Sequence, residues 1–278
     1  MSELPHLGLH RDVPEVVYES WPAARSSVLK RFERSAAHAR EAMLHPSEPT
    51  PALELGQAVH RAILEPDRFA TEYVAAPKVD RRTTAGKAEW SAFQAEYKDH
   101  AILSAEDFAL AGALRDAAWS HPLVAEILRA PGMNEVSACW IDGETGEACK
   151  ARIDGLRRWL GRSLIVDVKT TKDASPSGFG REAIRYGYDA QMAHYRMGLA
   201  NLAPMERGCA IVALEKDPPH CAVVYVLPEE VIALGERKVR RWLARYAEAR
   251  RTDTWPGYAT ELQTLELPAW AWKEDEDE

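Results

Sequence analysis

The sequence changes character near Glu135, and this change constrains the fold more than any other feature. Beyond Glu135, short segments rich in β-branched and aromatic residues alternate with turn signals, a pattern that is typical of strands and hairpins. We expect the first three strands of a sheet at residues 135–141, 148–153 and 164–169. The turn residues of 142–146 and a turn near Gly161 separate these segments, so the strands are expected to form a meander.

The part of the chain before the sheet is expected to be mainly helical. Residues 26–44 are amphipathic at helical spacing, and Thr50 before Pro51 predicts the N-cap of a second helix, which Glu65 and Pro66 close. Further elements are expected in this order: helices at 85–97, 104–119 and 121–128, a helix at 177–202 interrupted at Gly187, strands at 208–214 and 221–227, and a helix at 228–251.

These elements predict an α/β fold in which a mainly helical N-terminal portion wraps onto a central mixed sheet flanked by helices. The hydrophobic content of 46% is ample for a packed core. We expect a single domain over 1–278, with a helical portion at 1–130, a core at 131–255 and a C-terminal segment at 256–278 that ends in an acidic tail.

The sequence lacks the signals of membrane insertion and export. It has no run of about 18 apolar residues, and its N-terminus lacks the basic-then-apolar pattern of a secretory signal. The cysteines show no close CxxC pairing, which thiolate metal sites usually have, and we expect buried free thiols at Cys139, Cys149, Cys209 and Cys221. A cytoplasmic protein is therefore expected.

The net charge of −8 argues against a generally basic coat for nucleic acid, but it does not exclude local basic clusters. One such cluster lies in the last expected helix and comprises Arg237, Lys238, Arg240, Arg241, Arg245, Arg250 and Arg251. It is either a solvated helix face or a surface for DNA.

Two strand segments carry the residues that point most directly to chemistry. Asp154 is expected at the end of one strand, and Asp167 and Lys169 face the same side of the next because strand side chains alternate. Two carboxylates on neighbouring strands can share Mg²⁺, a hard cation that prefers oxygen ligands. Lys169 could then orient or deprotonate the water that attacks a phosphodiester, since desolvation makes a lysine lose its proton more readily.

Each of these features also has a structural interpretation. Asp154 with Gly155 could be a turn, and Asp167 with Lys169 a solvated strand edge. Gln191 and Tyr195 are four residues apart and share a helical face, which could look at the site or could place a core tyrosine beside a surface glutamine. His60 lies in an apolar helical stretch, and taken alone it is more typical of a structural histidine.

Taken together, the order of these motifs resembles the RecB-like branch of the PD-(D/E)XK nucleases, and within it the RecE-type exodeoxyribonuclease VIII. The resemblance covers nearly the whole chain, and its motifs are Leu55 to His60, Glu135 to Ser137, Cys149 to Asp154, Asp167 to Pro176, Tyr188 to Tyr195, and Trp255 to Tyr258.

The resemblance implies a role for each matching residue. It implies metal ligation by His60, Asp154, Asp167 and the Val168 carbonyl, catalysis by Lys169, and support of the active site or of DNA ends by Gln191 and Tyr195. Glu135 is expected to act in the site or to buttress the metal shell or the basic residues Lys150 and Arg152, which are expected to bind DNA.

The resemblance also implies an activity and its partners. The implied activity is Mg²⁺-dependent resection of double-stranded DNA from its 5′ ends, with Mn²⁺ as a second candidate cation, which leaves 3′ single strands for phage-type recombination. The implied partners are DNA ends and a RecT-type single-strand annealing protein. Two alternatives stay open, namely a structure-specific endonuclease or nickase, and a DNA-binding module without catalysis.

Two further expectations concern cofactors and assembly. Some RecB-like relatives hold an iron–sulfur cluster with a cysteine before the histidine motif, but no cysteine precedes Cys139 here, so no such cluster is expected. The resemblance to the RecE type implies a homo-oligomeric ring of three or four subunits, in keeping with a C-terminal segment that carries more apolar area than a free tail should expose unless it packs on its own domain or on a neighbour. Its apolar residues include Tyr258, Leu262, Leu265, Leu267, Trp270 and Trp272.

Overall fold

A six-stranded mixed sheet forms the centre of the protein, whose computed structural model describes residues 4–45 and 50–267. The strands lie in the order β1-β4-β5-β6-β7-β8, and only β6 and β7 pair in parallel among neighbours. Their bounds are β1 Gly8–His10, β4 Gly132–Ile141, β5 Ala148–Trp159, β6 Arg162–Thr171, β7 Arg207–Glu215 and β8 Ala222–Val226. The predicted α/β fold with a central mixed sheet is confirmed.

The predicted meander is present as β4, β5 and β6, but β5 is longer than expected. Leu160 and Gly161 both have positive φ angles, 48° and 77°, which suits the two-residue turn of a tight hairpin between β5 and β6. β5 therefore continues to Trp159, and Asp154 lies within the strand. The prediction that Asp154 ends a strand is wrong, because Gly155 pairs with Val166 and continues the ladder.

Two helices form the crossover connection from β6 to its parallel neighbour β7. α9 (Pro176–Tyr186) and α10 (Tyr188–Leu202) are separated at Gly187, whose φ of 74° ends one helix before the next begins. The predicted interruption at Gly187 is confirmed. Ser175 caps α9 by accepting a hydrogen bond from the Gly178 amide, so the first turn of α9 is fixed just beyond the end of β6.

The N-terminal portion is mainly helical, as predicted. Its helices are α1 Glu15–Ser20, α2 Ser26–Leu29, a 3₁₀ helix at Lys30–Glu33, α3 Ala36–Leu44, α4 Pro51–Leu64, α5 Pro66–Glu72, α6 Thr84–Glu96, α7 Ala105–Ser120 and α8 Pro122–Arg129. Thr50 caps α4 as expected. The single helix expected at 26–44 is wrong, because Ser35 is extended and starts α3 by accepting a hydrogen bond from the His38 amide.

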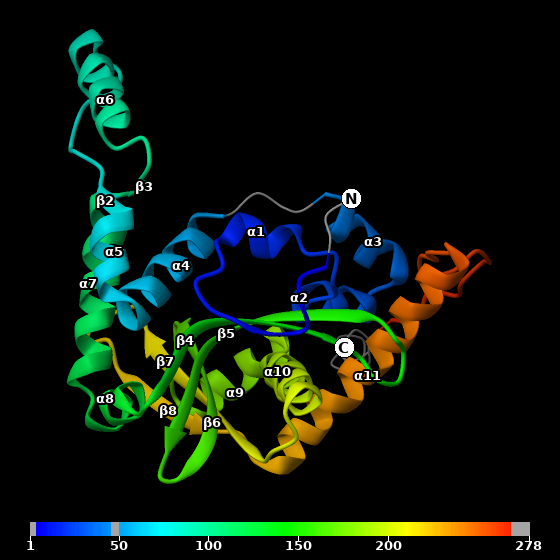
Figure 1. Cartoon of the computed structure of the whole chain (residues 1–278). Helices are drawn as coiled ribbons and strands as arrows, with labels where there is room; N and C mark the ends of the chain where they lie inside the picture. Colours follow the sequence, from blue (N-terminus) through cyan, green and yellow to red (C-terminus); the bar gives the residue numbers. More distant parts are fainter. Residues whose placement is uncertain (1–3, 46–49, 268–278) are drawn as a thin grey trace, which may run out of the picture.

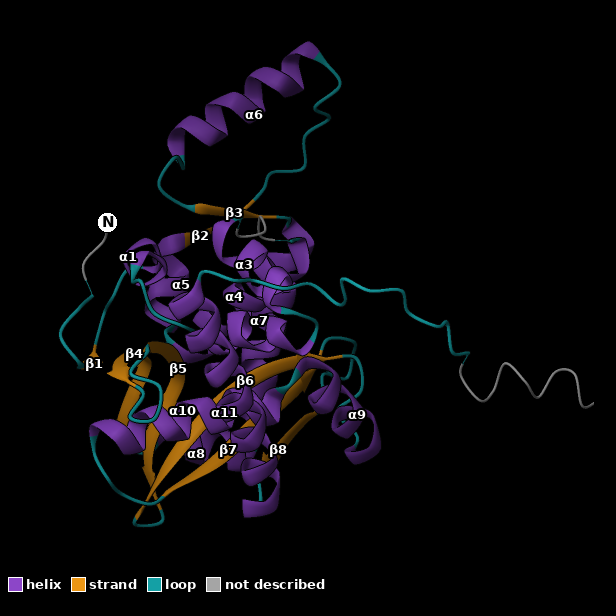
Figure 2. Cartoon of the chain, turned by 90° about the vertical axis from the view of Figure 1, so that its right-hand side faces the viewer, coloured by secondary structure: helices purple, strands orange, loops and turns teal. Residues whose placement is uncertain are grey.

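A small second sheet lies outside the main body. β2 (Tyr73–Ala75) and β3 (Ala101–Leu103) pair in parallel, and the segment between them carries α6 away from the rest of the molecule (Figure 1). Figure 2 shows the same separation from a second direction. Neither these two strands nor β1 was predicted, because three residues are too short to show an alternating pattern.

Both faces of the main sheet are buried. Ile153 and Ile165 belong to the cluster formed with α10 and with the last helix, α11 (Glu229–Thr252), whereas Val166 and Val168 belong to the cluster with α4, α7 and α8. The predicted core positions of Val166 and Val168 are confirmed. Alternation then places Asp167 on the α10 side of β6, inside the protein.

The cysteines follow the prediction in part. Cys139, Cys149 and Cys209 are buried free thiols, but Cys221 is exposed because it precedes β8 instead of lying within it. Among the described residues, no helix combines the length and apolarity that a membrane crossing requires.

Candidate active site

The candidate site lies in a fork between β5 and β6. The two strands pair from the hairpin turn up to Gly155 and Val166, and beyond these residues their ladder stops. Asp154 stands at this point, 7% exposed, and its Oδ2 accepts a hydrogen bond of 2.7 Å from the Val168 amide. The carboxylate thus replaces a backbone partner in the ladder, which holds it rigidly between the separating strands.

Asp167 and Lys169 occupy the β6 side of the fork. Asp167 is fully buried, and its Oδ2 lies 2.6 Å from the Lys169 ammonium. The Lys169 ammonium also lies 5.1 Å from the centre of the Tyr188 ring at the start of α10. The predicted alignment of Asp167 and Lys169 on one side of β6 is therefore present, and the pair is enclosed instead of forming a solvated edge.

His60 and Glu135 reach the same fork from two other elements. The Nδ1 atom of His60, on α4, lies 3.3 Å from Oδ2 of Asp154. Glu135 interrupts the regular pairing of β4 with a φ of 48°. One possible ligand atom from each of His60, Glu135 and Asp154 lies within 4.8 Å of the others. Sequence reasoning had given Glu135 a supporting place, whereas the structure groups it directly with His60 and Asp154.

Burial and the Asp154 carboxylate raise the pKa of two acidic groups in the fork. Burial, followed by the Asp154 carboxylate, raises the pKa of Glu135 to about 7. Burial also raises the pKa of Asp167 to about 6, although Lys169 opposes this shift and Asp154 adds to it. Neighbouring carboxylates in a buried site repel each other when ionised, so the fork favours a bound cation.

The donor set fits a divalent metal ion. It combines an imidazole with buried carboxylates, and apart from the Lys169 ammonium the oxygens of Asp167 have no hydrogen-bond donor among residues 4–45 and 50–267. Oxygen-rich sets of this kind suit Mg²⁺ and Mn²⁺. Ligation by Asp167 and by the Val168 carbonyl stays a prediction, because the grouped ligand atoms come from the other three residues.

The surroundings of Lys169 favour its protonated form. The sequence had instead suggested that desolvation would make this lysine lose its proton readily. Burial lowers the pKa of Lys169, but the Asp167 and Asp154 carboxylates, with the hydrogen bond to Asp167, outweigh burial and raise it above its ordinary value. The geometry therefore favours a lysine that orients groups and stabilises negative charge over one that acts as a base.

Gln191 and Tyr195 share one face of α10, as predicted, and contact each other. The Gln191 amide donates a hydrogen bond of 2.7 Å to the Tyr195 hydroxyl, and Tyr195 is 5% exposed. Burial raises the pKa of Tyr195 well above its ordinary value, and the Asp167 and Asp154 carboxylates add to this. The pair therefore lies beside the acidic fork, while its role toward DNA stays a prediction.

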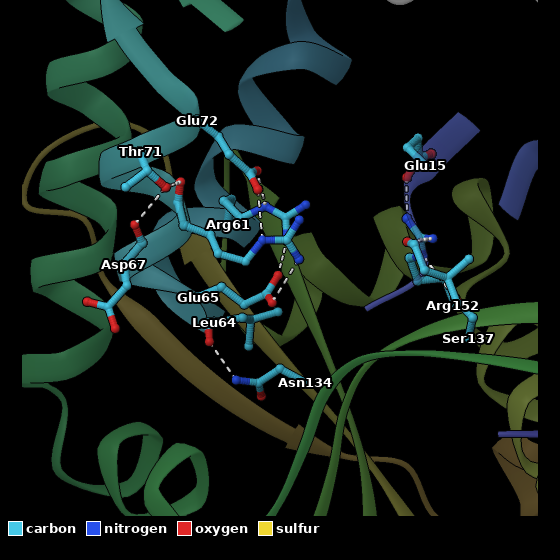
Figure 3. A network of polar contacts seen from close by, with 12 residues as sticks. Glu15, Arg61, Leu64, Glu65, Asp67, Thr71, Glu72, Asn134, Ser137 and Arg152 are labelled. Carbon is cyan, nitrogen blue, oxygen red and sulfur yellow. Dashed lines mark hydrogen bonds and ion pairs between the residues drawn. The ribbon is translucent and has the colours of Figure 1, made fainter. Parts of the chain in front are cut away.

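The structure separates Lys150 from Arg152. Lys150 is 3% exposed, and its ammonium donates to the carbonyl oxygens of Tyr18, Glu19 and Trp21. This geometry favours a structural role for Lys150 in place of the predicted DNA contact. Arg152 donates to Ser137 and pairs with Glu15, and it lines the cavity described next (Figure 3).

A cavity of about 270 Å³ opens onto the fork and gives a ligand access to it. It is lined by Glu15, Gln57, His60, Arg61, Tyr73, Glu135, Arg152 and Asp154. Arg61 pairs with Glu65 and Glu72, and the Asn134 amide donates to the Leu64 carbonyl at the end of α4 (Figure 3). The Arg61 pairs join α4 to α5, whereas the Asn134 hydrogen bond ties the end of α4 to β4, the strand that carries Glu135. Sequence reasoning gave no sign of Arg61 or Asn134.

The sequence matches a family model described as "PDDEXK-like domain of unknown function (DUF3799)" over residues 25–268. The chain belongs to this family. The PD-(D/E)XK assignment made from the motifs is thus confirmed at the family level, and the PDDEXK-like family supports a nuclease. The likeness to the RecE type in particular stays a prediction. No curated protein matches the chain.

One solved structure supports the fold of this PDDEXK-like protein. It is similar to the crystal structure of a "putative exonuclease" from Eubacterium rectale, at 13% identity, with a TM-score of 0.61 and coverage of 95% of this chain and 98% of the other. Protein VC1899 from Vibrio cholerae, at 12% identity and 81% and 57% coverage, gives a TM-score of only 0.22. Protein SSO0001, at 17% identity and 54% and 69% coverage, gives 0.27. At these identities the first similarity shows the fold alone.

Proposed function

We propose that the protein is a metal-dependent DNA exonuclease that hydrolyses phosphodiester bonds of double-stranded DNA from its 5′ ends and leaves 3′ single-stranded tails. The observation that carries this proposal is the convergence of Asp154, Asp167 and Lys169 with His60 and Glu135 in one enclosed fork. A buried cluster of carboxylates beside one lysine suits phosphodiester hydrolysis, because it can hold both a divalent cation and the anionic substrate.

Each residue has a distinct part in the proposed reaction. His60, Glu135, Asp154 and Asp167 would hold Mg²⁺, or Mn²⁺ as the second candidate. When bound, this cation supplies positive charge to the phosphate and lowers the pKa of water. Lys169 would orient the attacking water and stabilise the negative charge that develops on the phosphate oxygens. Tyr195 and Gln191 would close the α10 side of the fork against bulk water.

Attack at a DNA end, as opposed to an internal position, has two supports. The motif order resembles the RecE-type exonucleases, and the structurally similar Eubacterium rectale protein is described as a "putative exonuclease". A RecT-type annealing partner and a ring of three or four subunits are predictions from the same resemblance. In keeping with an intermolecular contact, Tyr258, Leu262 and Leu265 are 74%, 103% and 85% exposed. Trp270, Trp272 and the acidic end lie outside the described residues.

Linear duplexes labelled at either 5′ or 3′ end, compared with a covalently closed circle of the same sequence, test the proposal. With Mg²⁺, we expect early release of the 5′ label, late release of the 3′ label and an intact circle. With a chelator, we expect no cleavage. Cutting of the circle at the rate of the linear DNA would establish an endonuclease instead. Absence of cleavage with Mg²⁺ and with Mn²⁺, despite DNA binding, would leave a binding module.

A further inference from the structure

A second hollow, of about 610 Å³, lies beyond the end of β6 and is lined by positive charge. Four basic side chains line it, from the end of β6, from α9 and from the end of β7, namely Lys172, Arg181, Arg185 and Lys216. None of the four forms an ion pair within the described part of the chain. The acidic Glu182 in the lining accepts a hydrogen bond of 2.7 Å from the Thr171 hydroxyl and forms no ion pair with the four basic groups among the described residues.

This basic hollow lies next to the candidate active site along β6. Asp167, Lys169 and Thr171 follow one another on the same face of β6, so the hollow begins one side chain beyond Lys169. The Tyr188 ring lies beside the Lys169 ammonium and stacks on Tyr186, with ring centres 5.8 Å apart and an interplanar angle of 25°. Tyr186 is 50% exposed and lines the hollow, so an aromatic pair leads from the fork to its mouth.

The basic residues of α11 provide a contrast within the same chain. Lys238 pairs with Asp189, Arg240 with Asp142 and Glu144, and Arg250 with Glu147. Internal carboxylates thus neutralise much of the positive charge on that helix. In a chain of net charge −8, the unpaired cations gathered in the hollow are therefore suited to a polyanion.

The chemistry of the lining indicates which polyanion fits. Lysine and arginine side chains contact backbone phosphates, and an open aromatic ring can stack on an unpaired base, a combination typical of single-strand binding. A closed duplex offers phosphates but keeps its bases stacked on each other. We propose that the basic hollow binds the single-stranded DNA segment adjacent to the phosphate that is cleaved. This inference rests on the proposed nuclease function and adds a subsite to it.

Fluorescence anisotropy of a labelled oligothymidylate, measured in a chelator so that no cleavage occurs, tests the subsite. Arg181→Ala combined with Lys216→Ala is expected to weaken binding about tenfold, and to lower the slope of log affinity against log salt by about 1.4, since each lost phosphate contact contributes about 0.7. The matched control combines Arg158→Ala with Arg162→Ala, two exposed basic residues at the opposite, hairpin end of β6, and should bind as the wild type does.

The aromatic contact has its own matched pair of variants. Tyr186→Ala is expected to weaken oligothymidylate binding about tenfold, whereas Tyr186→Phe keeps the ring and should bind normally. Equal affinity of Arg181→Ala/Lys216→Ala and the wild type would overturn the subsite, as would an equal loss in the Arg158→Ala/Arg162→Ala control. If the hollow variants lose as much affinity for a blunt hairpin duplex as for the oligothymidylate, the hollow is not specific for single strands.

Cleavage assays on the same proteins separate this inference from the proposed function. If the wild type cleaves no DNA but the hollow variants lose single-strand binding, the nuclease proposal is removed and the binding site is kept. A wild type that cleaves linear DNA, with unchanged substrate KM and unchanged oligothymidylate affinity in the hollow variants, would remove the subsite and keep the nuclease. Circular dichroism of each variant verifies that the fold is intact.

Discussion

The carboxylates of the β5–β6 fork and those beside α11 are the same chemical groups in different surroundings. Beside α11, buried Asp189 and Asp142 each face a basic side chain, Lys238 and Arg240 respectively, and their charges are matched within the chain. In the fork, Asp167 pairs with the Lys169 ammonium, whereas Glu135 and Asp154 form no ion pair with a lysine or arginine among residues 4–45 and 50–267. Folding alone does not require the second arrangement, since like charges at close range are unfavourable.

The difference indicates which charged groups stabilise the fold and which serve function at a cost in stability. Matched charges fix the position of α11 on α10, and removal of one partner should be felt in stability and not in activity. In the fork, removal of a charged group should be felt in activity and not in stability, because its charges are balanced only when a cation and a phosphate are bound. Variants in the two regions should therefore separate into two classes, ordered below from the largest expected effect to the smallest.

The fork should lose activity without losing its fold. Asp154→Ala, Asp167→Ala and Lys169→Ala are each expected to lower the rate of linear-DNA cleavage by about 1,000-fold or more, because cation binding and charge stabilisation need all three groups. Digestion assays measure the rate, and circular dichroism monitors the fold. Near-normal turnover of Lys169→Ala would show that the lysine has no part in the reaction, and that the comparison between the two regions fails for this residue.

The α11 pair should lose stability without losing activity. Lys238→Ala leaves the carboxylate of Asp189, which is 2% exposed, without its cation, and we expect a decrease of about 3 kcal/mol in the free energy of unfolding. Urea denaturation measures this change. The double variant Lys238→Ala/Asp189→Ala should lose less than the two single changes together, because no unpaired charge is left.

A surface pair on the same helix serves as the control for Lys238. Arg251 and Glu248 are 71% and 61% exposed, and Arg251→Ala should change stability by about 0.5 kcal/mol or less. A loss in Arg251→Ala as large as in Lys238→Ala would contradict the importance of burial. A large loss of cleavage in correctly folded Lys238→Ala would contradict the separation into two classes.

The sequence predicted the elements whose signals are local. Alternation around Val166 and Val168, the turn at Gly161 and the break at Gly187 each act within a few residues, and each appears in the structure. β5 was predicted too short because Asp154 followed by Gly155 resembles a turn. The ladder with β6, formed by residues about ten positions away, overrides that local preference.

The site was predictable in its motif residues but not in its arrangement. Asp154, Asp167 and Lys169 could be identified from their order along β5 and β6, whereas the place of Glu135 beside His60 depends on how α4 docks on β4 through Asn134. Distant contacts also explain why Lys150 was predicted to bind DNA although the structure favours a structural role for it. Its burial comes from residues 18–21, which are distant in sequence and carry no pattern that announces the contact.

His60 tests whether the fork is completed by a metal ion. His60→Ala is expected to raise the Mn²⁺ concentration needed for half-maximal cleavage by about 10- to 100-fold while DNA binding persists, because the imidazole would complete the ligand shell and not contact phosphate. Titration of activity against Mn²⁺ measures the shift. His6→Ala, at an exposed position, is the matched control, and an unchanged metal dependence in His60→Ala would return His60 to a structural role.

The smallest expected effect is on the pH dependence of stability, and Glu135 isolates it. Its pKa is raised from an ordinary value of 4.5 to about 7 in the folded protein, so the folded state binds its proton more tightly than the unfolded state does. In a chelator, stability should therefore fall by about 1 to 2 kcal/mol as pH rises from about 4.5 to about 7.

Glu135→Gln cannot ionise, so it should reduce this fall, and saturating Mn²⁺ should reduce it in the wild type by neutralising the carboxylates. Urea denaturation across this pH range, with and without Mn²⁺, gives the curves. Arg251→Ala, which removes an exposed charge on α11, should leave the slope of the curve between these pH values unchanged. A wild-type curve that is flat in chelator, or one whose slope survives in Glu135→Gln, would mean that burial and the Asp154 carboxylate do not raise the pKa of Glu135. The contrast with α11 would then rest on Asp167 alone.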